Sequence, residues 1–88
     1  MIYDKDCHVR ESVVAALRFL KGPEILTPIV AALNDKIYIV RFQAVKTLCE
    51  LDLPGSFQLL RDHLRKETVD NIKKMIEESL GKMDTFVP

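Results

Sequence analysis

The sequence predicts an all-α protein, a short solenoid of about five helices arranged as repeated pairs. The pattern VRFQAVKTLCEL at residues 40–51 stands one repeat earlier as VRESVVAALRFL and, more loosely, one repeat later as IKKMIEESLGKM. Apolar residues recur at helical spacing, and the apolar/polar alternation typical of strands is almost absent. The chain has only three glycines and is 48% apolar, which favours a folded helical domain over a disordered segment.

The internal repeat is visible when the sequence is shifted by 31 residues against itself. This shift aligns nine identical pairs: Asp4/Asp35, Lys5/Lys36, Val9/Val40, Arg10/Arg41, Val14/Val45, Leu17/Leu48, Leu20/Leu51, Pro23/Pro54 and Leu33/Leu64. With one extra residue the pattern returns at Glu67, Ile72, Lys73, Ile76, Leu80 and Met83. The third copy is degenerate, as terminal repeats often are.

The first full unit reads as two helices. The first, at residues 8–21, is expected to bury Val9, Val13, Ala16, Leu17 and Leu20, and Gly22-Pro23 ends it. The second, at residues 23–33, is expected to bury Leu26, Ile29, Val30 and Leu33. Pro28 falls near its first turn, where proline is tolerated or bends the helix.

The remaining helices follow the same plan. Helices are expected at residues 38–51, 54–66 and 68–82, with Asn34-Asp35 as a turn. Their core positions are Val40, Ala44, Leu48 and Leu51, then Phe57, Leu60 and Leu64, then Ile72, Ile76 and Leu80. Residues 1–83 are expected to form one domain, and residues 84–88, which lack periodicity, a loose tail.

An acid and a base recur six residues apart in each unit. The pairs are Asp4 and Arg10, Asp35 and Arg41, and Glu67 and Lys73. A carboxylate in a turn before a helix caps backbone N–H groups, and a base one turn inside reaches the carboxylate of its own or the adjacent repeat. We interpret these residues as a structural ladder between repeats, with anion binding or catalysis by an arginine as the alternative.

At these residues the chain resembles a known family. The run D-x-x-x-x-V-R-x-x-A/V-x-x-x-L-x-x-L, followed by proline and an apolar helix, is similar to the HEAT repeat, in particular the short variety of phycobilisome lyase-like proteins. The resemblance implies an armadillo-like, right-handed superhelix whose concave surface is lined by the helices at residues 8–21, 38–51 and 68–82. The chain departs from the pattern at its start, since Met1 to Asp4 match the end of a helix, so the array begins in the middle of a repeat.

A second apolar stripe on the helix at residues 38–51 is the predicted binding site for a partner. It comprises Tyr38, Phe42, Val45 and Cys49. The equivalent positions in the neighbouring units are mostly polar, which indicates exposure, although a second core stripe is the alternative. We expect an exposed apolar strip on the concave face, rimmed by Glu11, Arg18 and Lys74, and such patches mark interaction sites.

The uncovered side of the first helix is a second candidate surface. Ala15 and Phe19 stand where the third helix has Lys46 and Glu50, whereas terminal repeats normally carry a polar cap. We expect Ile2, Ala15 and Phe19 to seal against another copy of the chain or a preceding repeat. The alternative is that Phe19 folds over the second helix.

Composition and motifs argue against several other functions. Thirteen basic residues balance thirteen acidic ones, so nucleic-acid binding is not expected. Cys7, His8, Asp62 and His63 lack the spacing of a metal site, and no nucleophile has an evident base, so we expect no metal, no cofactor and no catalytic residue. No stretch is long and apolar enough to span a membrane, and the expected location is the cytoplasm.

These observations predict a non-catalytic module that binds a protein or peptide on its concave face. The first alternative is an accessory subunit of a bilin lyase-like enzyme. The second is a structural end piece of a longer repeat array, which the start in mid-repeat favours.

Overall fold

The computed structural model describes residues 5–20, 23–51 and 55–84, and within these ranges it contains only helices. The α-helices are α1 (Cys7–Ala16), α2 (Leu26–Leu33), α3 (Tyr38–Leu51), α4 (Ser56–Leu64) and α5 (Asp70–Asp84). Two 3-10 helices, η1 (Leu17–Phe19) and η2 (Pro23–Ile25), stand between α1 and α2. None of the described helices is both long and apolar enough to cross a membrane.

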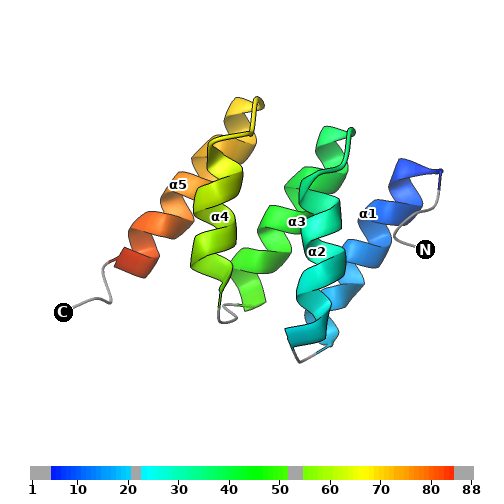
Figure 1. The fold of residues 1–88 in the computed structure, drawn as a ribbon. Helices are drawn as coiled ribbons and strands as arrows, with labels where there is room; N and C mark the ends of the chain where they lie inside the picture. Colours follow the sequence, from blue (N-terminus) through cyan, green and yellow to red (C-terminus); the bar gives the residue numbers. More distant parts are fainter. Residues whose placement is uncertain (1–4, 21–22, 52–54, 85–88) are drawn as a thin grey trace.

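The helices form two layers (Figure 1). α1, α3 and α5 lie side by side in one layer, and α3 contacts both of the others. α2 and α4 cover this row from one side and run antiparallel to it. The result is a row of stacked helix pairs, which confirms the predicted all-α repeat architecture.

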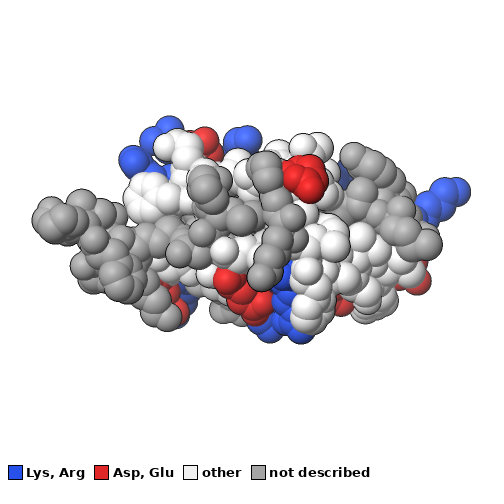
Figure 2. All heavy atoms as spheres, turned by 90° about the horizontal axis from the view of Figure 1, so that it is seen from below, with Lys and Arg blue, Asp and Glu red and all other residues white. Residues whose placement is uncertain are grey.

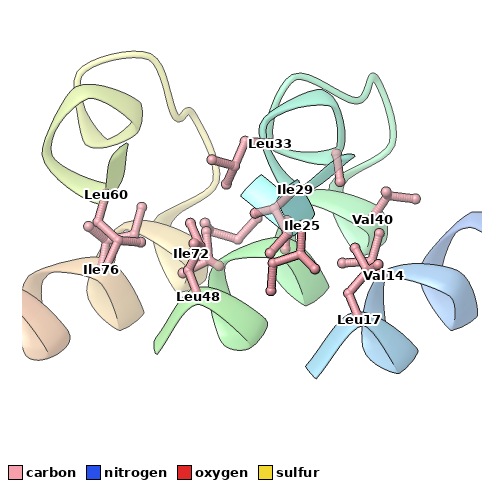
Figure 3. Close-up of a cluster of buried hydrophobic side chains, with 13 residues drawn as sticks. Val14, Leu17, Ile25, Ile29, Leu33, Val40, Leu48, Leu60, Ile72 and Ile76 are labelled. Carbon is pink, nitrogen blue, oxygen red and sulfur yellow. The ribbon is translucent and has the colours of Figure 1, made fainter. Parts of the chain in front are cut away.

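The core lies between the two layers (Figure 3). Its buried apolar side chains come from every helix of the row and of the covering layer: Val14, Leu17, Ile25, Ile29, Ala32, Leu33, Val40, Ala44, Val45, Leu48, Leu60, Ile72 and Ile76. Val40, Ala44 and Leu48 are fully buried, as predicted, and Leu51 packs against the core edge. Each fully buried aliphatic side chain contributes about 1.5–3 kcal/mol through removal of apolar surface from water.

Six predicted core residues lie outside the observed core. Val9, Val13 and Phe57 are half-buried and belong neither to the buried cluster nor to the side chains packed against it, and Ala16, Leu20 and Val30 are exposed. Leu20 is 55% exposed because the α-helix gives way to η1 and Leu20 itself has an extended backbone, so the side chain leaves the helical phase. Val30 is 36% exposed on the outer side of α2, whose inner side is occupied by Ile29 and Leu33. Ala16 is exposed on the outer side of α1.

The observed helix boundaries agree best with the predicted ones for α3, which spans the predicted residues 38–51. η2 moves the start of α2 to Leu26 and places Pro28 in the first turn, where the backbone N–H groups have no intrahelical acceptor. α4 begins at Ser56 because Gly55 caps it in the left-handed region, at φ 91°. α5 runs through Asp84, so this residue is not in the tail; residues 85–88 lie outside the described ranges.

Candidate functional site

Paired acids and bases connect consecutive repeats and fix the surface around them. Arg10 on α1 donates through Nε to Asp35 Oδ2 at 2.7 Å and through Nη2 to Oδ1 at 3.0 Å. Asp35 Oδ1 also accepts the backbone N–H of Ile37 at 2.9 Å. Burial raises the pKa of Asp35, but the hydrogen bonds from Arg10 and Ile37 outweigh burial and hold this pKa below its ordinary value.

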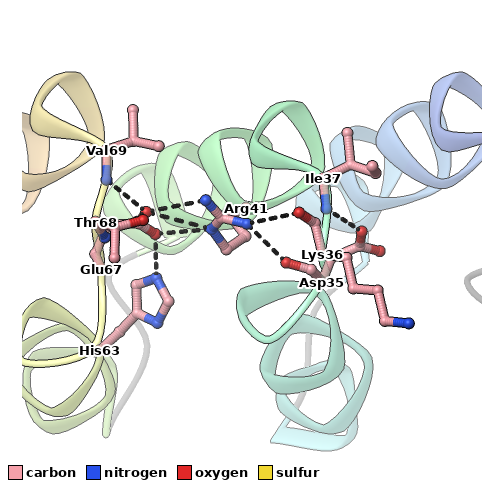
Figure 4. A network of polar contacts seen from close by, with 8 residues as sticks. All are labelled: Asp35, Lys36, Ile37, Arg41, His63, Glu67, Thr68 and Val69. Atoms are coloured by element: carbon pink, nitrogen blue, oxygen red, sulfur yellow. Dashed lines mark hydrogen bonds and ion pairs between the residues drawn. The ribbon is translucent and has the colours of Figure 1, made fainter.

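The second ion pair repeats this geometry between α3 and the turn before α5 (Figure 4). Arg41 donates through Nε to Glu67 Oε1 at 3.0 Å and through Nη2 to Oε2 at 3.1 Å. Its Nη1 donates to the backbone carbonyls of Asp35 at 2.9 Å and Lys36 at 3.1 Å. One guanidinium therefore ties together two turns of neighbouring repeats.

The Glu67 carboxylate has hydrogen-bond contacts with four residues, Arg41 among them. Its Oε2 accepts the backbone N–H groups of Thr68 and Val69, both at 3.0 Å, and its Oε1 lies 2.7 Å from His63 Nε2. Burial raises the pKa of Glu67, yet the hydrogen bonds from Arg41, Val69 and His63 lower it to about 2. The sequence interpretation missed His63, although the spacing of four residues from Glu67 is the helical pairing distance.

The contacts of Arg10 with Asp35 and of Arg41 with Glu67 are those that a ladder between repeats would need, and among the described residues no contact joins Lys73 to a carboxylate. Asp35 and Glu67 cap backbone N–H groups, and each is reached by the arginine of the preceding repeat. Lys73 occupies the equivalent position on α5, and Asp4 lies outside the described residues. The arginine donors are directed at carboxylates and turn carbonyls of the chain itself, which is the arrangement of a structural device.

An apolar hollow opens on the face formed by α1, α3 and α5. It has a volume of about 290 Å³ and is lined by Glu11, Tyr38, Ile39, Phe42, Val69, Asn71 and Ile72, here called the Phe42 pocket. Tyr38 is 56% exposed and Phe42 37% exposed, as predicted. The pocket draws on three helices of the row and therefore exists only when the repeats are stacked.

The other half of the predicted strip is wrong as an exposed surface. Val45 is fully buried, and Cys49 is half-buried with its Sγ 2.8 Å from Ser79 Oγ on α5. The contact with Ser79 directs the Cys49 side chain toward α5, and α3 and α5 are in contact along the row. The exposed apolar strip is thus confined to Tyr38 and Phe42.

The predicted rim is only partly assembled. Glu11 lines the Phe42 pocket, with its Oε1 3.9 Å from His8 Nδ1. Arg18 pairs with Glu50 at 3.6 Å, where η1 and α3 end, and Lys74 is exposed on α5; neither lines the pocket. The sequence interpretation missed Ile39 on α3 as a pocket residue. It also missed Val69, Asn71 and Ile72, which reach the pocket through the packing of α5 on α3.

Two of the residues predicted for self-association, Ala15 and Phe19, lie in α1 and in η1 directly after it. Phe19 is 73% exposed and carries the Arg18 guanidinium 4.8 Å above its ring, so it does not fold over the second helix. Ala15 is half-buried, and Ile2 lies outside the described residues. On the face seen in Figure 2, charged side chains of both signs lie among uncharged ones.

No group of three His, Cys, Asp or Glu side chains in residues 5–20, 23–51 and 55–84 is arranged to hold a metal ion. His8 is exposed, whereas His63 is buried against Glu67.

The comparisons agree with the stacked helix pairs. A model of HEAT repeats matches residues 1–81. Searches of curated proteins and of solved structures gave no significant match. The match covers almost the whole chain and coincides with the repeated acid and base and with the two-layer packing, so the chain belongs to the HEAT-repeat family.

Proposed function

We propose that this protein is a non-catalytic binding module that holds a segment of another protein on the face formed by α1, α3 and α5. HEAT repeats commonly mediate contacts between proteins. The observation that carries the proposal is the Phe42 pocket, an apolar hollow in the same face as two exposed aromatic side chains. Exposed aromatic residues next to an apolar pocket are typical of interaction sites.

The chemistry of the pocket suggests its ligand. Tyr38, Phe42 and Val69 form an apolar wall, while Glu11 supplies a carboxylate and Asn71 an amide at the edge. A peptide with a large aliphatic or aromatic side chain fits the wall, and a lysine or arginine nearby in the peptide pairs with Glu11. Arg41 of the ladder is engaged within the protein and does not contact the peptide. Recognition of the peptide therefore depends on the fit of its apolar side chain and on one charge, that of Glu11.

The size of the pocket separates this function from the alternatives. Small-molecule pockets typically measure about 300–1,000 Å³, and the Phe42 pocket, at about 290 Å³, accommodates one or two side chains. A linear tetrapyrrole is larger, so no observation favours a bilin lyase-like accessory role. A purely structural end piece would leave the exposed pair Tyr38 and Phe42 without a use.

The test is a selection of random peptides on the immobilised protein, followed by calorimetry with the selected peptides. We expect an enriched motif of an apolar anchor close to a basic residue. Phe42→Ala should weaken binding by about tenfold or more, and Glu11→Lys should weaken only the peptides that carry the basic residue. Circular dichroism of each variant checks that it is folded.

The matched control is Phe19→Ala, which removes an even more exposed aromatic ring outside the pocket. Binding should be unchanged in this variant. Peptides that bind equally well to the protein and to Phe42→Ala would contradict the proposal.

A further inference from the structure

The outer side of α1 carries a second apolar surface, separate from the Phe42 pocket. A shallow hollow of about 480 Å³ lies there and is lined by His8, Val9, Ser12, Val13 and Ala16, here called the α1 outer face. Val9 and Val13 are half-buried, and Ala16 is exposed.

The repeat itself indicates what kind of element fits this face. The shift of 31 residues matches its five positions with Ile39, Val40, Gln43, Ala44 and Thr47 on α3. Val40, Ala44 and Thr47 are fully buried, and the Thr47 hydroxyl donates to the carbonyl of Val14 on α1 at 3.4 Å. In α3, therefore, the equivalent face is covered by a neighbouring helix of the row. The α1 outer face occupies the equivalent position on α1, so a helix of the same repeat type would fit against it.

The opposite end of the row does not provide such a helix surface. Val14 on α1 and Val45 on α3 are fully buried, whereas the matching residue on α5 is Glu77, which is exposed. Glu78 and Lys74 are exposed on the same helix. A second copy thus meets charge at its α5 end and an apolar helix surface at its α1 end.

We propose that two copies of this chain associate through their α1 outer faces, with the two α1 helices packed antiparallel across a two-fold axis. Such an interface is isologous, so it closes as a dimer and does not propagate into a filament. The small side chains of Ser12 and Ala16 allow the helix axes to approach to about 8 Å. The Ser12 hydroxyl already donates to the His8 carbonyl at 2.9 Å, so its burial leaves no unsatisfied donor.

Sedimentation equilibrium of the protein from low to high micromolar concentration tests the dimer. We expect the average mass to rise toward twice that of the chain. Ala16→Glu places a charge in the interface and should raise the dissociation constant by about tenfold or more. Ala16 is exposed, so this variant should fold, and circular dichroism verifies that it does. Glu78→Lys at the α5 end and Phe42→Ala should leave the dimer unchanged.

Cross-linking tests the orientation. In the head-to-head dimer, Ser12→Cys brings two identical thiols together near the axis, and mild oxidation should join the copies, whereas the unmodified protein and Glu78→Cys provide the background. A protein that remains monomeric at every concentration would overturn the proposal. So would a dimer that survives Ala16→Glu, or a disulfide formed mainly between the Ser12→Cys and Glu78→Cys chains in a mixture.

The two proposals concern different surfaces and fail independently. If Phe42→Ala loses peptide binding but still dimerises, the result bears only on the Phe42 pocket. If Ala16→Glu no longer dimerises but still binds the peptide, the result bears only on the α1 outer face.

Discussion

The two ion pairs of the ladder occupy equivalent places but differ in depth. Asp35 accepts two hydrogen bonds from Arg10 and one from a backbone N–H, and its side chain is 12% exposed. Glu67 accepts hydrogen bonds from Arg41 and from two backbone N–H groups, also contacts His63, and has a side chain with no exposed surface. The position in the repeat thus determines where a carboxylate lies. The residues that contact the carboxylate determine how much it contributes to the free energy of unfolding.

Removal of each carboxylate should reveal this difference directly. Glu67→Ala leaves Arg41 buried without its carboxylate and uncaps two backbone N–H groups, so we expect a loss of about 3–5 kcal/mol in the free energy of unfolding. Asp35→Ala should cost about 1–3 kcal/mol, because the Asp35 side chain keeps 12% of its surface exposed, whereas that of Glu67 has none, and only one N–H loses its cap. Urea unfolding followed by circular dichroism gives both values.

The control for this pair is Glu78→Ala on the exposed side of α5, which should change stability by less than about 0.5 kcal/mol. Equal losses for the Glu67 and Asp35 variants would show that the additional contacts of Glu67 contribute nothing.

Acid should weaken the protein chiefly through Glu67. Its folded pKa of about 2 lies below the ordinary 4.5, so its contribution is fully present above about pH 4.5 and is lost as the pH falls toward 2. This difference corresponds to about 3 kcal/mol. Asp35, whose pKa is also lowered, acts in the same direction. Urea unfolding at a series of pH values measures the loss, and Glu67→Gln should flatten the dependence more than Asp35→Asn does.

The same difference explains how far the sequence could predict the molecule. The repeat and the helical periodicity were sufficient for the helix pairs and for α3. They left open whether each arginine reaches the carboxylate of its own or of the adjacent repeat, and the structure places Arg10 on Asp35 and Arg41 on Glu67. His63 was interpreted only as a poor metal ligand, because its role requires the turn that brings Glu67 back over α4.

The candidate site was predicted in part for a related reason. Periodicity assigned Tyr38 and Phe42 to a surface, but it also assigned Val45, since one of its two equivalents is the polar Glu77. The informative equivalent was Val14, which is buried at the same position. Val69 and Asn71 could not be found because they join the pocket through the packing of α5 against α3, which no local pattern encodes.

The smallest expected effect concerns His63, which contacts Glu67 in the ion pair with Arg41 and has no counterpart among the described residues around the ion pair of Arg10 with Asp35. His63→Phe keeps a ring of similar shape in the buried site but removes the 2.7 Å contact with Glu67 Oε1. Glu67 keeps Arg41 and both backbone N–H groups, so we expect a loss of only about 1–2 kcal/mol.

A double-mutant cycle of His63→Phe with Glu67→Gln separates the contact from the packing of the ring. A coupling energy near 1 kcal/mol would assign part of the difference between the two ion pairs to His63. Coupling near zero would assign that difference to the backbone caps at Thr68 and Val69, and the deeper burial of Glu67 would then follow from the turn alone.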